Sequence, residues 1–573
     1  MYSATGRRRT LAITAGLAAS ALLVAACSSN GSSNQTATGG STTAGGGAAA
    51  GGALADTILI GTTDKITTID PAGEYDNGSF AVINQVYPFL LNTPYGSPDV
   101  KPDIAESASF TDPTTYTVKL KAGLKFANGD DLTSSDVKFS FDRVQAIGAS
   151  GADGGNGPSS LLGNLASTDA PDPTTVVFHL TAANDQTFPQ VLSSPAGPIV
   201  DEQVFPADKL LADADIVKAE PFAGPYSITD YTVNQLITYK ANPDYQGLYG
   251  APKTPNVNVT YYADASNLKL AVQQGEVDVA FRSLSATDID DLRKDTNLQV
   301  IDGPGGEIRY IVFNFDTQPY GAKTPDADPA KALAVRQAVA DLIDRSAIAD
   351  QVYKNTYSPL YSYVPAGLTG ANDALKGKYG DGNGGPSLDK AKAALQAAGV
   401  TTPVTLNLQY ATAHYGPSSA DEYGLVKDQL ESSGLFTVNL QTTEWTQYSK
   451  DRTSDVYPEY QLGWFPDYSD ADNYLTPFFT WSDKTNNSGF LANHFPSKGK
   501  ITDDILKEAT TTDPAARATA IGAVQDELAD QLPTIPLLQG AQVAVVGKGV
   551  EGTKDTLDAS FKFRYGALTK TQG

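Results

Sequence analysis

The side chains able to act as nucleophiles or to bind a metal are few and widely spaced in this sequence. Cys27 is the only cysteine among 573 residues, and the three histidines, His179, His414 and His494, lie far apart. Zinc sites usually take Cys and His ligands from short spacings, which none of these residues offers. No G-x-S-x-G or Walker A motif occurs either. We therefore expect no zinc site and no activated nucleophile.

Two further motifs suggest chemistry but fail on their spacing. Asp467, Asp470 and Asp472 resemble the start of a calcium loop, which needs Gly at its sixth position and Glu at its twelfth. Counted from Asp467, these positions hold Asp472 and Phe478. Gly380-x-Gly382-x-x-Gly385 fits the dinucleotide pattern, but no strand-like segment precedes it. Carboxylate pairs for glycoside hydrolysis stay open, since no pair stands out. We expect no metal, no cofactor and no catalytic residue.

The surroundings of Cys27 indicate a covalent modification instead. Three arginines at 7–9 precede a mostly apolar run over 11–26, as in a secretory signal, and the run is short for a membrane span. Val24-Ala25-Ala26-Cys27 resembles the lipobox of bacterial lipoproteins, in which the Cys thiol receives a diacylglycerol and becomes the new N-terminus. The resemblance implies a signal peptide over 1–26 and lipid attachment at the outer face of the cell membrane. An unmodified Cys beside an ordinary signal peptide is the alternative, and Sec and twin-arginine export both stay open.

Composition limits the class of protein. Residues 28–52 are almost wholly Ser, Gly, Ala, Thr, Asn and Gln, so we expect the lipidated Cys27 and a flexible linker over 27–52. The remaining chain exceeds one ordinary core and predicts two or more lobes. A formal net charge of −24 argues against nucleic acid, which is bound largely through Lys and Arg. The 28 Tyr and 21 Phe suit clefts for polar organic ligands, although most of them would serve as half-buried strand residues.

The elements that must position a site are of both kinds. Apolar alternation predicts strands at 57–61, 115–126, 174–180, 235–242 and 309–316. Helix starts are indicated by Thr133 with Asp136, by Ser387, and by Asp-Pro pairs at 328–329 and 513–514. This mixture predicts α/β lobes with several sheets.

Five stretches, taken in order, match the pattern of one family. They are PDIAESASFTDPTTYTVKLKAGLKFANGDDLTSSDVKFSFDRV (102–144), PFAGPYSITDYTVNQLITYKANPDY (221–245), AVQQGEVDVA (271–280), AVRQAVADLIDRSAI (334–348) and LGWFPDYSDADNYLTPFF (462–479). Together they resemble the solute-binding proteins of family 5, the dipeptide- and oligopeptide-binding lipoproteins of bacterial ABC importers. Two positions depart from that pattern, since Ala223 replaces a Gly and Ala471 replaces a Pro. The resemblance spans residues 58 to 552.

The family resemblance implies a fold. It is an α/β, two-lobed periplasmic-binding-protein-like fold with hinge strands and an extra domain inserted in the first lobe. The implied bounds are 53–95, 220–308 and 535–573 for the discontinuous first lobe, 96–219 for the inserted domain, and 309–534 for the second lobe. The strand-like segment 309–316 falls where a hinge crossover is expected. Ligand would bind between the lobes, and the hinge would close on it.

The resemblance also implies a ligand site. In the peptide-binding members, the Asp of the G-W-x-x-D segment receives the α-ammonium group of the ligand, and here that residue is Asp467. A carboxylate that meets a cation in a closed cleft makes a strong charge-assisted contact. The backbone of Gly463, Trp464 and Phe465 would pair with the ligand main chain as an added strand. The plainer alternative is an Asp in a surface turn.

Three more side chains are candidates. Trp464 and Trp445 match family positions that line side-chain pockets, with core packing as the alternative. His414 lies where some members place a basic ligand contact, with a plain exposed histidine as the alternative.

The function that follows is capture rather than catalysis. We expect a monomeric, lipid-anchored extracytoplasmic protein that binds peptides and delivers them to ABC permease subunits driven by a cytoplasmic ATPase. A non-peptide solute, such as a sugar or a nickel complex, is the alternative cargo. An anchored extracellular hydrolase is a less favoured alternative, because the sequence shows no catalytic constellation. The two classes differ in what they do to a peptide: a hydrolase would cleave it, whereas a receptor releases it intact.

Overall fold

The computed structural model describes residues 54–416, 418–480, 499–557, 559 and 562–572. Cys27, the apolar segment before it, the linker and His494 lie outside the described residues. No helix among the described residues is both long and apolar enough to cross a bilayer. Three larger sheets organise the described part of the chain.

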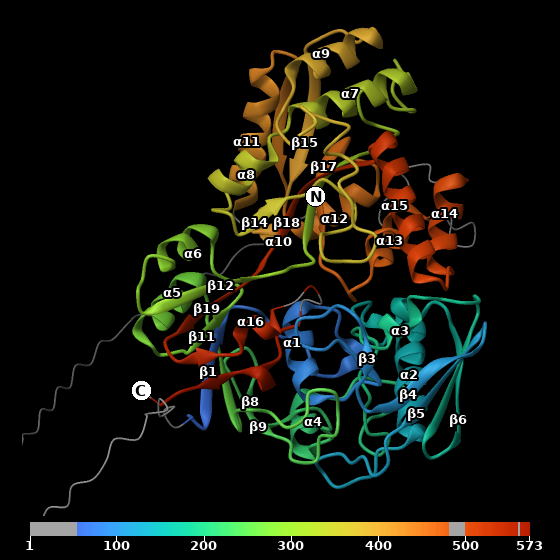
Figure 1. Cartoon of the computed structure of the whole chain (residues 1–573), viewed down its shortest axis with the longest axis vertical. Coiled ribbons are helices and arrows are strands. Elements are labelled where there is room, and N and C mark those ends of the chain that lie inside the picture. Colours follow the sequence, from blue (N-terminus) through green and yellow to red (C-terminus); the bar gives the residue numbers. More distant parts are fainter. Residues whose placement is uncertain (1–53, 417, 481–498, 558, 560–561, 573) are drawn as a thin grey trace, which may run out of the picture. The chain divides into compact units, whose positions relative to one another are not determined.

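A seven-stranded sheet joins three separate parts of the chain. Its order is β12 (Leu298–Gly303), β19 (Gln542–Gly547), β11 (Val279–Phe281), β1 (Thr57–Thr62), β10 (Asn256–Tyr261), β9 (Leu236–Ala241) and β8 (Tyr226–Thr232). Figure 1 shows β1 in blue, β11 in green and β19 in red within this one sheet. Side chains alternate across it, so Val545 packs with helix α5 (Ala265–Gln274) while Val546 packs with α1 (Asn77–Val86) on the other face.

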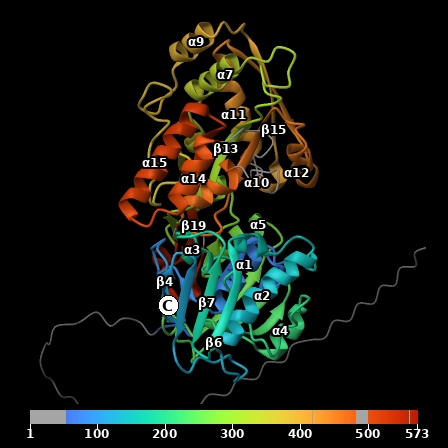
Figure 2. The same ribbon diagram turned by 90° about the vertical axis from the view of Figure 1, so that its right-hand side faces the viewer.

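A four-stranded antiparallel sheet lies within the segment expected to be inserted. Its order is β4 (Ala105–Asp112), β5 (Thr115–Leu120), β7 (Thr175–Leu180) and β6 (Leu165–Asp172). Helix α2 (Ser134–Ser150) packs on it, as Figure 2 shows, and buries Val137, Phe141 and Ile147 against the sheet. The expected capping box is confirmed, since Thr133 and Asp136 bond reciprocally at the start of α2.

A six-stranded sheet forms the core of the second lobe. Its order is β14 (Tyr357–Pro359), β18 (Thr534–Gly540), β13 (Ile308–Phe313), β17 (Glu459–Trp464), β15 (Val404–Tyr410) and β16 (Phe436–Thr442). The accompanying helices include α7 (Pro329–Leu342), α8 (Arg345–Gln351), α9 (Leu388–Ala397), α10 (Thr412–Tyr415), α11 (Ser418–Ser432), α12 (Trp445–Thr453), α13 (Thr476–Phe479), α14 (Lys500–Ala509) and α15 (Pro514–Gln531). The N-caps expected at Asp328, Ser387 and Asp513 are present on α7, α9 and α15.

The chain passes between the seven-stranded sheet and the six-stranded sheet at two adjacent crossovers, each of which connects a strand of one sheet to a strand of the other. One runs from β12 to β13 and the other from β18 to β19. They touch, because the Gly540 N–H donates to the Glu307 carbonyl at 2.9 Å, and a Cβ on Gly305 would lie 1.9 Å from the Gly540 carbonyl oxygen. All seven residues of β18 are buried in the six-stranded sheet. The last change of sheet therefore comes at Ala541, six residues after the expected 535, because β18 is an interior strand of the second sheet.

Two expected strands are shorter than their apolar patterns. The strand expected over 115–126 ends at Leu120, and Gly123 turns the chain with a φ of +73°. The strand expected over 309–316 ends at Phe313, where the Asn314 side chain accepts a hydrogen bond from the Asp316 N–H at 3.0 Å. In both cases a local turn ends the strand, although apolar residues still occur at the following positions of the sequence.

A buried ion pair fixes α2 to the loop before α1. Both terminal nitrogens of Arg143 donate to the Asp70 carboxylate at 2.7 Å, and the two side chains are 1% and 0% exposed. Asp70 also caps the short 3₁₀ helix Pro71–Gly73. Removing one partner of such a pair leaves an uncompensated buried charge.

We predict that Asp70→Asn lowers the free energy of unfolding by about 3–5 kcal/mol, because the Arg143 charge stays buried without a counter-ion. The control is Asp142→Asn, which breaks the exposed Lys138–Asp142 pair on the same helix and should cost under about 0.5 kcal/mol. Urea denaturation of the three proteins measures both effects. Equal small losses would show that the buried pair contributes no more than the surface pair.

Candidate functional site

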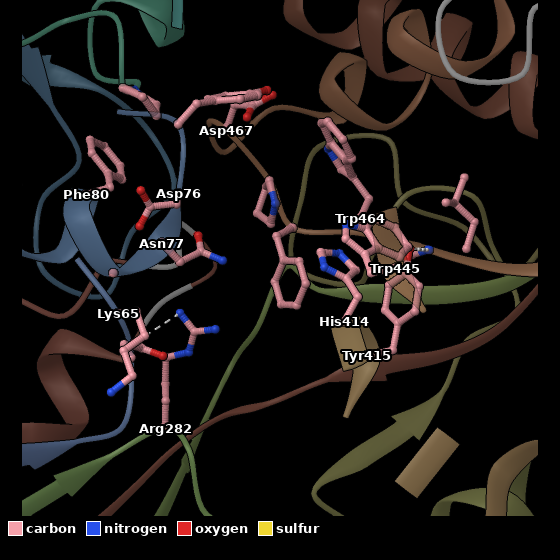
Figure 3. Close-up of a pocket in the computed structure, with 18 of the residues that line it drawn as sticks. Lys65, Asp76, Asn77, Phe80, Arg282, His414, Tyr415, Trp445, Trp464 and Asp467 are labelled. Atoms are coloured by element: carbon pink, nitrogen blue, oxygen red, sulfur yellow. Dashed lines mark hydrogen bonds and ion pairs between the residues drawn. The ribbon is translucent and has the colours of Figure 1, made fainter. Parts of the chain in front are cut away.

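A cavity of about 460 Å³ is lined by β17 of the six-stranded sheet, by the segment that follows β17, and by segments that follow β1 and β11 of the seven-stranded sheet. Figure 3 shows Lys65, Asp76, Asn77, Phe80 and Arg282 on one side and His414, Tyr415, Trp445 and Trp464 on the other. All six residues expected at the site line this cavity: Asp467, Gly463, Trp464, Phe465, Trp445 and His414. Its volume is typical of sites that hold one small organic ligand.

One buried amide holds Asp467 in place. The Asn473 side-chain N–H donates to the Asp467 carboxylate at 3.1 Å. The Asn473 carbonyl oxygen accepts from the Asp467 backbone N–H at 3.0 Å and from the Trp464 indole N–H at 2.8 Å. Asn473 is 1% exposed, so this bonding is shielded from water. A single residue therefore orients two of the expected site residues.

The carboxylate of Asp467 meets neutral donors. Burial raises its pKa to about 6, while hydrogen bonds from Asn473 and from the Tyr75 hydroxyl lower that pKa. Glu74 is completely buried close by, and its pKa is raised well above the usual value by burial and by the charges of Asp76 and Asp467. Asp76 and Asp467 both line the cavity, and a cationic ligand beside the desolvated Asp467 would stabilise its ionised form.

Gly463 sits where a side chain has no room. On β17 it pairs with Arg309 of β13, and a Cβ on it would lie 2.7 Å from the Ile308 carbonyl oxygen and 3.0 Å from the Tyr415 ring. The Gly463 N–H donates to the Tyr415 hydroxyl at 3.0 Å. Strand-like pairing with a ligand would therefore use the backbone nearer Phe465, because this donor already serves Tyr415.

Aromatic rings form one wall of the cavity. His414 stacks on Trp445 with ring centres 3.7 Å apart and an angle of 6°, and the Tyr415 ring stands edge-on to His414 at 4.7 Å. Trp464 packs edge-on against Phe478 at 5.0 Å. Desolvation between these walls lowers the pKa of His414 below its usual value. The residue as a whole is exposed at the rim of the cavity, so a ligand could reach its ring, and its role as a ligand contact stays a prediction.

Arg282 brings a cation that the sequence did not indicate. It follows β11, two residues beyond the matched segment that ends at Ala280, and forms an ion pair with Asp64 at 3.7 Å. Its guanidinium lies 5.9 Å from the centre of the Phe465 ring. The backbone at Arg282 and Ser283 is left-handed, with φ of 59° and 67°, which is unusual for non-glycine residues. This strained turn places Arg282 in the cavity wall. The amino-acid preferences for turns do not predict a left-handed backbone at Arg and Ser, so the sequence did not reveal this position.

Two further residues were not predicted from the sequence. Asn473 lies within the matched segment 462–479, six residues after Asp467, where the family pattern G-W-x-x-D-x-x-D-P-x-N ends in Asn, so that pattern could have identified it. Tyr75 has no such signal, because only the fold brings it to Asp467. No group of three or more potential metal ligands occurs within the part of the chain that the structure describes.

Comparison with known proteins places the chain among solute-binding proteins. Residues 99–486, well over half of the chain, match the model of the bacterial extracellular solute-binding proteins, family 5. The glutathione-binding protein GsiB of Escherichia coli K12 is 26% identical over 525 residues, covering 89% of this chain and 94% of that protein. The probable D,D-dipeptide-binding periplasmic protein DdpA of the same strain is 24% identical over 506 residues, covering 87% and 91%.

Solved structures share the fold. The DppA binding protein of Helicobacter pylori in complex with the peptide STSA matches with a TM-score of 0.70 at 19% identity, covering 91% of this chain and 99% of that one. CtaP of Listeria monocytogenes matches with a TM-score of 0.74 at 22% identity, covering 91% and 100%. The two-lobed α/β fold expected from the sequence is confirmed. The chain belongs to family 5 of the bacterial extracellular solute-binding proteins, and it is a substrate-binding protein of the ABC-importer type rather than an enzyme.

Proposed function

We propose that this protein captures peptides with a free amino terminus and delivers them to the permease of an ABC importer. The observation that carries the proposal is the Asp467 carboxylate, which faces the cavity, is largely desolvated and is held by the neutral Asn473 and Tyr75. An α-ammonium group would compensate its charge with little loss of hydration on the protein side. Relatives named for glutathione and D,D-dipeptide binding favour the same class of cargo.

The lining of the cavity suggests how a peptide would lie. Its amino terminus meets Asp467 at the acidic end, and its main chain passes the backbone near Phe465. Its carboxylate meets Arg282, whose planar guanidinium suits bidentate contact with a carboxylate. Side chains contact the rings of Trp445 and Trp464, which accept apolar groups of different shapes. Main-chain recognition of this kind permits broad specificity.

Transport would use the two crossovers as a hinge. The lobes expected from the sequence are 53–95, 220–308 and 535–573 for lobe I, and 309–534 for lobe II, with 96–219 inserted in lobe I. Because β18 lies in the six-stranded sheet, we propose 541 in place of 535 as the start of the last segment of lobe I. A peptide that touches both walls of the cavity would favour the closed arrangement, because it contacts that state more extensively. A monomeric binding protein would then present the closed form to the permease, whose cytoplasmic ATPase drives release.

The same proposal places the protein at the membrane through Cys27. The lipobox-like segment and the polar linker over 27–52 support a diacylglycerol thioether at this thiol, on the extracytoplasmic face. A chain of this composition has a reach of roughly 5–6 Å multiplied by the square root of its length. The binding lobes would therefore stay near the permease without being rigidly fixed to it.

We predict that Asp467→Asn weakens the binding of a peptide with a free amino terminus by roughly 30- to several-thousand-fold, which corresponds to about 2–5 kcal/mol. The substitution removes the charge and retains the shape. N-acetylation of the peptide should weaken binding to the native protein comparably and to the variant much less. Calorimetry of the four combinations forms a double-mutant cycle.

A coupling energy near zero in that cycle would show that Asp467 does not recognise an amine. The cargo would then belong to the alternative class of sugars, metal complexes or other non-peptide solutes. Intact release of the bound peptide, followed by mass spectrometry, is the control that separates a receptor from a hydrolase.

Peptide affinity should fall as the pH drops below about 6, because Asp467 then takes up a proton and loses the charge that holds the ammonium. Binding calorimetry across this pH range measures the change.

The contribution of Asp467 to the free energy of unfolding of the unliganded protein should change with pH in the opposite direction to the peptide affinity. The pKa of Asp467 is raised on folding, so its contribution to stability is present at low pH and is lost as the pH rises through 6. Without ligand, Asp467→Asn should therefore match the native protein near pH 4 and exceed its stability at pH 8 by up to about 3 kcal/mol. Urea denaturation at both pH values measures this, and an unchanged difference would contradict it.

Cys27→Ala should abolish incorporation of labelled fatty acid and leave the signal segment uncleaved by the lipoprotein signal peptidase. The physical reason is that a methyl group cannot form the thioether. Metabolic labelling followed by gel electrophoresis measures incorporation, with Ser28→Ala as the matched neighbouring control. Labelled fatty acid in the Cys27→Ala protein would refute the proposed anchor.

A further inference from the structure

The segment proposed as the inserted domain, 96–219, meets the second lobe away from the cavity. The Gln186 N–H, shortly before α3 (Phe188–Val191), donates at 2.8 Å to the carbonyl of Ala509 at the end of α14. Figures 1 and 2 both show α14 facing α3. The second lobe is therefore in direct contact with the inserted domain, in addition to its connection to the first lobe through the crossovers.

Tyr468 extends from the second lobe into a hydrophobic cluster of the other part of the chain. It follows β17 and comes directly after Asp467. The other buried members of its cluster all come from residues 72–223, and they include Val137 and Phe141 of α2 and Phe178 of the four-stranded sheet. Tyr468 is 8% exposed. Because a buried tyrosine ring makes a large apolar contact, the loop that carries Asp467 is held partly by the inserted domain.

The same side chain reaches the amide that orients Asp467. Burial and the neighbouring carboxylates raise the pKa of the Tyr468 hydroxyl well above its usual value, while a hydrogen bond with the Asn473 side chain lowers that pKa. Asn473 in turn donates to the Asp467 carboxylate at 3.1 Å. Tyr468 thus connects the core of the inserted domain to the residue that fixes the candidate ammonium-binding group.

The loop is also fixed to its own lobe. Both terminal nitrogens of Arg517, on α15, donate to the Asp470 carboxylate at 2.8 and 2.7 Å. Asp470 caps the 3₁₀ helix Ala471–Tyr474, which contains Asn473. Because these contacts tie the loop to the second lobe, a movement of that lobe away from the inserted domain has to withdraw the Tyr468 ring from its cluster.

The contact between the inserted domain and the second lobe is not a continuous core. A cavity of about 270 Å³ lies between them, lined by Pro98, Gln186 and Gln190 on one side and by Asp470 and Arg517 on the other. Atoms that face a cavity lose the packing contacts that atoms in a core make. The two sides can therefore separate at a lower cost than two halves of one core could.

We propose that Tyr468 is a positioning residue, which makes the inserted domain part of the binding device. Its ring, held in the cluster of residues 72–223, fixes Asp467 where the amino group of the ligand is received. The inference rests on the proposed function for the identity of that amino group. It gives the inserted domain a part in ligand binding, although the six residues expected at the site all lie in the second lobe.

Four variants of the full chain test this inference. Tyr468→Ala and Tyr468→Leu remove the ring, and Tyr468→Phe keeps the ring and removes only the hydroxyl. The matched control is Phe110→Ala, which removes a half-buried ring that packs edge-on against Tyr116 in the same cluster. This control loosens the cluster from within the inserted domain. Thermal denaturation shows which variants fold, and Tyr468→Leu retains an apolar side chain should Tyr468→Ala fail to fold.

Two measurements are made on each protein. Hydrogen exchange resolved to single amides, with and without a peptide that has a free amino terminus, follows the N–H groups of Gln186 and Asp467. These two groups bond to Ala509 and to Asn473, so they report the contact and the position of Asp467 separately. Calorimetry measures the affinity for the peptide and for its N-acetylated form.

Removal of the ring should lower the protection of both amides about 10-fold or more. It should weaken binding of the free-amino peptide about 10- to 100-fold and binding of the N-acetylated peptide less, because only the free amine uses Asp467. Tyr468→Phe should keep the protection of Gln186 and weaken binding no more than about 5-fold, since it loses one hydrogen bond. Phe110→Ala should change the affinity less than about 2-fold, as for a residue remote from the site.

Unchanged protection of the Asp467 amide and unchanged affinity in the folded ring-removing variants would overturn the positioning role. An equal loss of affinity in Phe110→Ala would also overturn it, because the effect would then come from general loosening of the inserted domain. Native binding that is insensitive to N-acetylation is a different result, which refutes the proposed recognition of an amine. In that case the exchange of the Gln186 and Asp467 amides alone decides whether Tyr468 positions the loop.

Discussion

The desolvated carboxylate of Asp467 is the interaction on which the candidate site depends. Neutral donors from Asn473 and Tyr75 hold it, and burial raises its pKa to about 6. Such a group is costly without a ligand and favourable with a cationic one, so we expect the same residue to lower the stability of the unliganded protein and to supply affinity for the ligand. The buried Asn473 fixes Asp467 and Trp464 together, so the charged contact and an aromatic wall keep one relative geometry.

The two crossovers give this site its opposing walls. Because they run side by side, with no room for a Cβ on Gly305 beside Gly540, the connection between the larger sheets is narrow. The six-stranded and seven-stranded sheets each have their own hydrophobic core. The buried Asp70–Arg143 pair fixes helix α2 to the loop before α1. A narrow connection between two sheets with separate hydrophobic cores would permit hinge closure around a ligand.

Local sequence signals predicted the site unevenly. Asp467, Trp464 and Asn473 lie within one short segment that turns back on itself, so a pattern of spacing can describe them. Tyr75 and Arg282 reach the same cavity from the first lobe, 392 and 185 residues before Asp467, counted as 467 − 75 and 467 − 282. The stacking of His414 on Trp445 was also beyond a pattern, because it joins side chains of two separate helices, α10 and α12.

The sequence by itself determined the fold class, the helix starts at Thr133, Asp328, Ser387 and Asp513, and most strand positions, because caps and apolar alternation are short-range properties. It also determined membership of the solute-binding family through segments that keep their order along the chain. Only the tertiary structure decided that β18 belongs to the second sheet, that Arg282 faces Phe465, and that Tyr468 packs in the cluster formed by residues 72–223. These features arise where segments distant in the chain pack together, and burial, charge and volume at such places depend on all the neighbours at once.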